Sequence, residues 1–166
     1  QKVSNQGTEF ASRHTFAEYV RWRLDTAKNG VIHNFHTFFL LRREAKLAPK
    51  LDIEAYQEAW QALTELPFFG FVEEFNTSIR LFNQMHAGWV ELKAVPGAAK
   101  NVTQKSDITL ADRLDQIRAE LGDSLYEELL DRNDYDMRLY TDAWKAFEDR
   151  RQSYDIAYEI NPGFQR

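Results

Sequence analysis

Three groups of residues in this sequence have types and spacings suited to chemistry. The first is Glu73, which follows the apolar run Phe68 to Val72 and precedes a helix start at Asn76. The run is too short for a stable helix and too apolar for a loop, so it predicts a short buried strand. Open α/β sheets bind ligands at the carboxyl ends of their strands, which makes Glu73 a candidate for chemistry. The pattern also fits a core strand followed by a solvated glutamate.

The second group lies in the segment 96–106, which concentrates small, amide and hydroxyl residues. Lys100 and Lys105 supply positive charge there, and Asn101 and Thr103 supply hydrogen-bonding side chains. Backbone N–H groups and lysines in such a loop can wrap a phosphate. An ordinary solvent-exposed loop has much the same composition, so both interpretations stay open.

The third group is the pair His33 and His36, within a helix expected from Val31 to Leu47. Two imidazoles three residues apart can bind one metal ion. No carboxylate or third histidine is close in the sequence, so solvated or core positions are favoured and no metal site is predicted.

Helix start and stop signals account for nearly every other apolar segment. Thr15 and Glu18 form a capping box, and Asp52 and Thr109 are predicted N-caps. Trp89 to Leu92 has the pattern of an edge strand. A long final helix is expected from Asp134 to just before Pro162, with one inner stripe of residues: Met137, Tyr140, Trp144, Phe147, Arg151, Tyr154 and Tyr158.

The expected fold class is therefore mainly α with one or two short strands. The inner side of the helix from Val31 to Leu47 is expected to carry Asn34, Phe35, Phe38, Leu41 and Ala45. We expect one domain or part of one over residues 1–166, with residues 1–14 and 159–166 as extended tails. The strand Phe68 to Val72 should lack a partner within this chain, which leaves an apolar edge that a second copy can cover in a homodimer.

Composition sets the remaining limits. The chain has 166 residues, of which 43% are hydrophobic and 14% aromatic, enough for a proper core. Its net charge of -5 argues against a general nucleic-acid-binding protein. The absence of cysteine suits a reducing compartment, the cytoplasm if the source is bacterial. No apolar run approaches the roughly 20 residues that span a bilayer, so no membrane segment is expected.

One further set of motifs runs through the second half of the chain: Phe68-Phe69-Gly70-Phe71-Val72-Glu73, Ser78, Asn101-x-Thr103, Asn133-x-x-Asp136-Met137-x-Leu139-Tyr140, Ala143, Phe147 and Arg150. This set resembles the C-terminal half of carbohydrate sulfotransferases, above all the heparan-sulfate 6-O-sulfotransferase branch and its bacterial relatives. The matches cover roughly half the chain in the family's order, and Asn34 with Leu41 is a fainter match before them. The run from Asn133 to Tyr140 is the most specific piece.

The resemblance implies the C-terminal portion of a P-loop-like α/β fold that uses 3′-phosphoadenosine 5′-phosphosulfate as donor and a carbohydrate or other hydroxyl as acceptor. Glu73 would then lie near the acceptor cleft, and the loop with Lys100, Asn101, Thr103 and Lys105 would close on the nucleotide. The set Asn133, Asp136, Leu139 and Tyr140 would mostly hold the last two helices together, with Asp136 capping and Tyr140 packed inward.

The sequence departs from that family in one large respect. The family's phosphosulfate loop, catalytic base and 3′-phosphate ligands lie in its N-terminal half, and no G-x-x-x-x-G-K pattern occurs here. We therefore expect this chain to be inactive alone. The alternative is a non-catalytic α-helical module that binds a protein partner through its aromatic faces.

Overall fold

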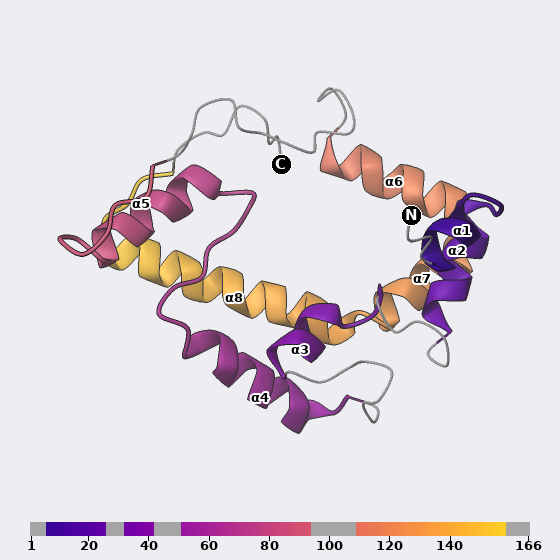
Figure 1. The fold of residues 1–166 in the computed structure, drawn as a ribbon, viewed down its shortest axis with the longest axis horizontal. Coiled ribbons are helices and arrows are strands. Elements are labelled where there is room, and N and C mark those ends of the chain that lie inside the picture. The colour runs from indigo at the N-terminus through magenta and orange to yellow at the C-terminus, as the bar shows by residue number, and fades with distance from the viewer. Residues whose placement is uncertain (1–5, 26–31, 42–50, 94–108, 159–166) are drawn as a thin grey trace, which may run out of the picture. The chain divides into compact units, whose positions relative to one another are not determined.

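The structure is a computed structural model that describes residues 6–25, 32–41, 51–93 and 109–158. These residues form helices joined by turns and extended segments, and none of them is in a strand (Figure 1). The mainly α class is therefore confirmed for the described residues. The helices are α1 (Gln6–Ala11), α2 (Phe16–Leu24), α3 (Phe35–Leu40), α4 (Ile53–Thr64), α5 (Phe75–Met85), α6 (Leu110–Leu121), α7 (Asp123–Asp131) and α8 (Asp134–Ser153).

The chain divides into two compact units. Unit 1 comprises Gln1–Leu63 and Leu114–Tyr140, and unit 2 comprises Thr64–Arg113 and Thr141–Arg166. The division falls inside α8, so the first turns of this helix belong to unit 1 and the rest to unit 2. None of the described helices has both the length and the apolar character needed to cross a bilayer.

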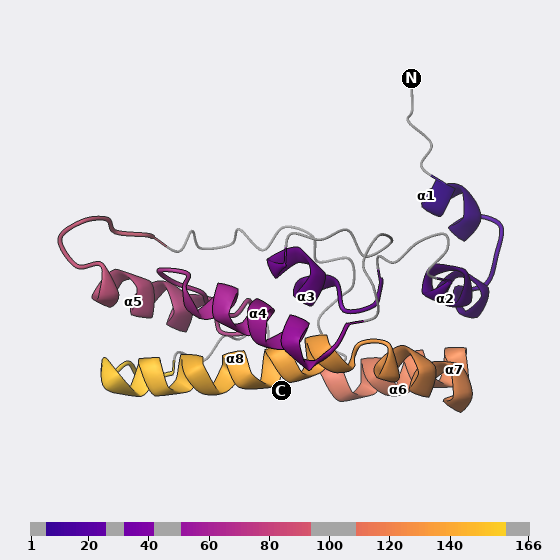
Figure 2. The same cartoon turned by 90° about the horizontal axis from the view of Figure 1, so that it is seen from below.

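In unit 1, α2 packs against α6 and α7 through a small aliphatic core (Figures 1 and 2). The buried members are Val20, Leu24, Leu121 and Leu125. Gly122 joins α6 to α7 with a φ of 73°, a left-handed conformation that glycine adopts at little cost. The last residue of α6 and an early residue of α7 can therefore both face α2.

The predicted caps at Thr15 and Asp52 in unit 1 and at Thr109 in unit 2 are confirmed. The Thr15 N–H donates to Glu18 Oε2 at 2.8 Å, and the Glu18 N–H donates to Thr15 Oγ1 at 3.3 Å. The Thr15 N–H and the Thr15 hydroxyl both donate to Glu18 Oε2, and these two bonds lower the pKa of Glu18. Asp52 accepts from the Ala55 N–H at 2.8 Å, and Thr109 accepts from the Asp112 N–H at 3.1 Å.

A second core of unit 1 joins α3, α4 and the start of α8. Its buried residues are Phe38, Leu41, Leu51, Ala55 and Ala59, and Tyr135 packs against them. The helix expected from Val31 to Leu47 is observed as α3, which starts later than predicted because residues 32–34 lie outside the α-helix. Residues 31 and 42–47 of the expected helix lie outside the described residues. Phe38 and Leu41 are buried as predicted, whereas Phe35 is exposed.

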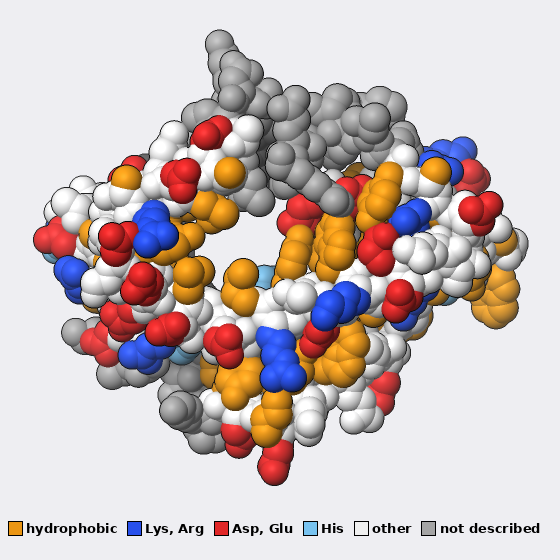
Figure 3. Space-filling model, turned by 180° about the vertical axis from the view of Figure 1, so that it is seen from behind, with side chains coloured by type: hydrophobic (Ala, Val, Ile, Leu, Met, Phe, Trp, Pro, Cys, Tyr) orange, Lys and Arg blue, Asp and Glu red, His pale blue; other side chains and the backbone are white. Residues whose placement is uncertain are grey.

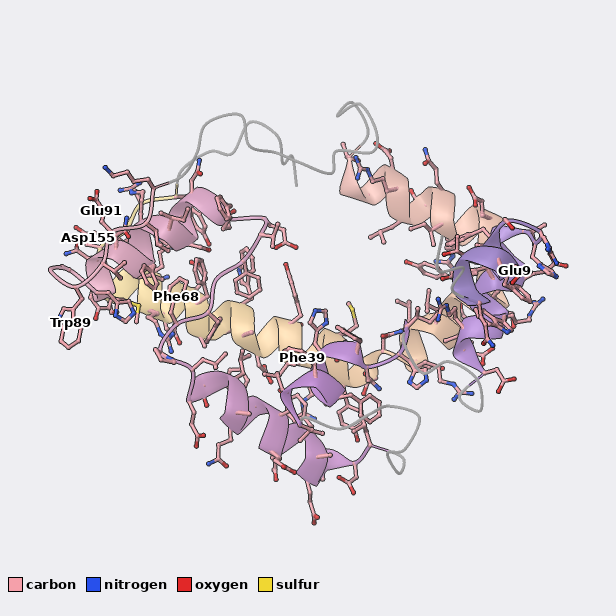
Figure 4. All side chains as sticks on the ribbon, in the orientation of Figure 1. Glu9, Phe39, Phe68, Trp89, Glu91 and Asp155 are labelled. Atoms are coloured by element: carbon pink, nitrogen blue, oxygen red, sulfur yellow. The ribbon has the colours of Figure 1, made fainter. Side chains whose placement is uncertain are left out.

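Unit 2 is built around the ring of Phe71. This ring lies edge-on to Trp144 at 4.7 Å and to Phe147 at 5.4 Å, both on α8. The predicted strand Phe68 to Val72 is not observed, because Phe71 satisfies its backbone groups through Ser78 instead of a neighbouring strand. Trp89 to Leu92 is not a strand either, and Trp89 points away from α5 (Figure 4).

The inner face of α8 differs from the predicted stripe. Leu139, Ala143 and Phe147, spaced four residues apart, are buried, while Met137, Tyr140 and Tyr154 are exposed. The expectation that Tyr140 packs inward is therefore wrong. The helix also ends at Ser153, well before Pro162.

The end of α8 is a Schellman motif. The Asp155 N–H donates to the Gln152 carbonyl at 3.0 Å, and the Ile156 N–H donates to the Arg151 carbonyl at 3.1 Å. Asp155 takes the left-handed conformation that this motif requires, with φ of 52°. Ile156 is buried, which anchors the segment after the helix.

Candidate functional site

The strongest polar cluster in unit 1 joins the N-terminus of α3 to the N-terminus of α8. Its members come from segments about 100 residues apart in the sequence: Asn34, His36, Thr37, Asn133 and Asp136. Each helix start is satisfied mainly by side chains of the other segment. We call these five residues the crossed-cap cluster.

Asp136 caps α3. Its Oδ1 accepts from the Thr37 N–H at 2.8 Å and from the Thr37 hydroxyl at 2.7 Å. Its Oδ2 accepts from the His36 N–H at 2.9 Å. The two backbone groups belong to the first turn of α3, and the N-cap residue Asn34 gives that turn no side-chain hydrogen bond.

Asn34 and Asn133 complete the exchange. Asn34 Oδ1 accepts from the Asp136 N–H at 3.0 Å, which satisfies a donor in the first turn of α8. Asn133 Oδ1 accepts from the Asn34 N–H at 3.0 Å, and its amide donates to the carbonyls of Ile32 and Leu129. Asn34 has φ of 48° and ψ of 39°, a left-handed conformation that asparagine tolerates better than most residues.

The expected roles of Asn133 and Asp136 are partly corrected by this geometry. Asp136 is a capping residue, but it caps α3 across the chain and does not tie together the last two helices. Asn133 does contact the end of α7, through the Leu129 carbonyl, as well as the segment before α3.

The two histidines beside the cluster have opposite environments. His33 is buried, its Nε2 has no hydrogen-bond partner among the described residues, and its ring meets Phe38 edge-on at 6.3 Å. Burial, with a smaller contribution from the Arg132 charge, lowers the pKa of His33. His36 is exposed, and its Nδ1 lies 3.2 Å from Asp136 Oδ2. His33 thus takes a core position and His36 a solvated one, the two positions that the sequence favoured for this pair.

No group of three or more potential metal ligands occurs within the described ranges. What the crossed-cap cluster can offer chemically is one exposed imidazole, held in orientation by a mostly buried carboxylate.

Glu73 lies beside a second, smaller constellation in unit 2. Ser78 Oγ accepts from the Phe71 N–H at 2.9 Å and donates to the Phe71 carbonyl at 3.2 Å. A Cβ on Gly70 would approach Ser78 Cβ and Oγ to 2.7 Å, so this close approach requires glycine. The two motif residues Gly70 and Ser78 thus fix the turn that carries Glu73.

Glu73 itself is half-buried in that turn, and it does not follow a strand. The N-cap of α5 is Glu74, so the prediction that Asn76 caps this helix is wrong. The difference of two residues arises because the chain turns at Phe71, whose carbonyl accepts from the Glu74 N–H at 3.2 Å.

The predicted phosphate-binding residues Lys100, Asn101, Thr103 and Lys105 lie outside the described residues. The segment that leads to them is held by Asn83 on α5. Asn83 Nδ2 donates to the Leu92 carbonyl and the Leu92 N–H donates to Asn83 Oδ1, both at 2.8 Å.

Comparison with known proteins finds one similarity to report. An uncharacterized protein of Archaeoglobus fulgidus is 32% identical over 140 residues, which cover 83% of this chain and 54% of that protein. The chain thus spans about half the length of the relative that it matches. No protein-family model and no solved structure matches the chain.

Proposed function

We propose that this chain is the C-terminal portion of a sulfotransferase. The enzyme would transfer a sulfuryl group from 3′-phosphoadenosine 5′-phosphosulfate to a hydroxyl of a carbohydrate or similar acceptor. The observation that carries the proposal is that residues of the sulfotransferase resemblance come together in the structure. Asn34, Asn133 and Asp136 meet in the crossed-cap cluster, and Gly70 meets Ser78 in unit 2. Residues chosen from sequence alone therefore form two coherent structural clusters, as expected of motifs that maintain one fold.

The length of the relative fits the part of the proposal that makes this chain one portion of a longer protein. Sulfuryl transfer needs a base for the acceptor proton and cationic groups for the charge on the sulfuryl oxygens and the departing phosphate. The resemblance puts most of these groups in a half that this chain lacks, and the relative is about twice as long as the matched segment. In this proposal Lys100, Asn101, Thr103 and Lys105 contact the donor, and Glu73 faces the acceptor.

The decisive experiment measures sulfate transfer from labelled donor. The 166-residue chain should give no transfer above a no-protein blank, because half of the required groups are absent. A longer parent protein that contains this sequence should be active. An inactive, correctly folded parent tested with a range of hydroxyl acceptors would refute the proposal.

Two variants of the parent test the assigned residues. Lys105→Ala should weaken binding of the desulfated nucleotide by about 1–3 kcal/mol, roughly 5- to 150-fold in calorimetric titration. Lys93→Ala is the matched control, since Lys93 is an exposed lysine just before the same segment. Glu73→Gln should reduce turnover more than donor affinity, whereas Glu91→Gln, an exposed glutamate on the same unit, should change neither.

The second candidate is a non-catalytic helical module that binds a protein partner. Trp89 favours it, because 93% of this side chain is exposed on the turn after α5 (Figure 4). Other hydrophobic side chains also reach the surface (Figure 3). The sulfate-transfer assay of the parent separates the two candidates, since an interaction module has no turnover.

A further inference from the structure

The exposed side of α3 carries two aromatic rings that the core does not use. Phe35 and Phe39 are 49% and 70% exposed, while Phe38 and Leu41 fill the adjacent core. The two rings are one helical turn apart, with centroids 6.2 Å apart and planes inclined by 24°. They therefore form a short, nearly continuous aromatic surface open to solvent, and Phe39, labelled in Figure 4, is its more exposed member.

A fixed hydrogen-bond acceptor borders this surface. The His36 ring stands edge-on to Phe35, with centroids 5.6 Å apart and planes at 82°. Its side chain is 76% exposed, whereas the Asp136 side chain that contacts Nδ1 is only 13% exposed. An ionised Asp136 can only accept, so Nδ1 of a neutral His36 carries the hydrogen and Nε2 is the free acceptor.

We propose that Phe35, Phe39 and His36 form a binding site for a neutral sugar ring. The apolar C–H face of a pyranose would stack on the aromatic surface, and one of its hydroxyls would donate to His36 Nε2. Among the described residues, the ring contacts and hydrogen bonds of this site involve the Asp136 carboxylate and no Lys or Arg, which disfavours a sulfated or carboxylated sugar. The further identification of this sugar as part of the acceptor rests on the proposed function.

The size of the surface favours a sugar over a protein. A stable protein interface buries about 800 Å² on each partner, and a buried aromatic side chain contributes about 150–250 Å² at most. The exposed parts of two phenylalanines and one imidazole fall well short of that area but match one pyranose. A purely apolar ligand would also make no use of the oriented Nε2 acceptor, which a sugar hydroxyl can fill.

The test is an NMR titration of the 166-residue chain with the tetrasaccharide of N-acetylglucosamine, followed through the imidazole nitrogens of His36 and the ring carbons of Phe39. We expect saturable shifts of both at millimolar sugar. Phe39→Ala should weaken binding about 2- to 12-fold, and His36→Ala should weaken it similarly. Trp89→Ala, which removes an even more exposed aromatic from unit 2, should leave the affinity unchanged.

Three results would overturn the proposal: no shift of His36, equal loss of affinity in Phe39→Ala and Trp89→Ala, or tighter binding of a fully sulfated tetrasaccharide than of the neutral one. Because Phe39 is mostly exposed, its alanine variant should keep the helical circular dichroism of the wild type. The titration needs no donor. A missing sugar shift with an active parent refutes this site alone, and sugar binding with an inactive parent refutes the proposed function alone.

Discussion

Asp136→Ala should destabilise unit 1 far more than a surface substitution does, because it leaves the first turn of α3 uncapped. The variant removes the acceptor for the Thr37 N–H and hydroxyl, and Thr37 is fully buried. The His36 N–H loses its acceptor too but lies at the surface, where water can replace it. Each buried donor left unpaired costs about 1–3 kcal/mol, so we expect a loss of roughly 3 kcal/mol in the free energy of unfolding.

The matched control is Asp134→Ala. Asp134 lies in the first turn of the same helix and carries the same charge, but it is exposed. Asp134→Ala therefore removes a carboxylate near the α8 N-terminus but leaves the cap on α3 in place. It should lower the free energy of unfolding by no more than about 0.5 kcal/mol.

The assay must resolve unit 1, because a chain of two units need not unfold in a single step. Residue-specific amide hydrogen exchange of Thr37 and its neighbours on α3 reports local opening, and urea titration followed by circular dichroism reports the total loss. A double-mutant cycle with Thr37→Val should give a coupling energy of about 0.5–3 kcal/mol. Equal effects of Asp136→Ala and Asp134→Ala, or a coupling near zero, would refute the capping role.

Three further predictions concern other parts of the chain. Gly70→Ala should lower the free energy of unfolding in urea by about 1–3 kcal/mol, because the added methyl group would lie 2.7 Å from Ser78. Adding Ser78→Gly to Gly70→Ala should relieve this clash, and no relief would contradict the clash as the cause. Asp155→Gly should add about 0.5–1 kcal/mol in the same assay, because glycine adopts the left-handed conformation more easily; a loss would exclude this account. Because the pKa of His33 is lowered in the folded protein, the unfolded chain takes up a proton at this residue at a higher pH than the folded chain does. The free energy of unfolding should therefore hold above pH ~6.5 and fall as the pH drops from ~6.5 to ~5. If the same fall persists in His33→Asn, another group causes it.

Local signals in the sequence were enough to predict the helix starts that depend on near neighbours. Thr15, Asp52 and Thr109 each bond a backbone N–H three residues away, so residue type and spacing contain all the needed information. The start of α5 was misplaced by two residues because it depends on the turn at Phe71, which is fixed by Ser78 within the helix itself.

The inner face of α8 shows where periodicity fails. Both the predicted stripe and the observed line of Leu139, Ala143 and Phe147 have helical spacing. The predicted stripe contains more aromatic residues, so it looked more apolar in the sequence although several of its members are exposed. Ala143 is small but buried, which hydrophobicity alone does not reveal. The strand prediction failed similarly, because an apolar run does not show whether a neighbouring strand or a serine side chain will satisfy its backbone.

The crossed-cap cluster lay beyond any local signal. Asn34, Asn133 and Asp136 drew attention through the sulfotransferase resemblance, but their partners His36 and Thr37 did not, since the bonds between the two segments join residues about 100 positions apart. Asn34 is the N-cap residue of α3 but its side chain makes no capping bond to that helix, which residue type alone would not predict. Only the structure shows that Asp136 caps α3 in its place.

This exchange of caps connects stability to the proposed sugar site. α3 spans six residues, far fewer than the roughly 12 that an isolated helix needs, so its existence depends on Asp136 and on the packing of Phe38. The exposed faces of Phe35 and Phe39 share an orientation only while α3 is helical, and the Nε2 of His36 is oriented by the same carboxylate. A residue that never contacts the sugar would therefore control both halves of the site, and Asp136→Ala should lose sugar binding together with helix protection, whereas Phe39→Ala should lose only the binding.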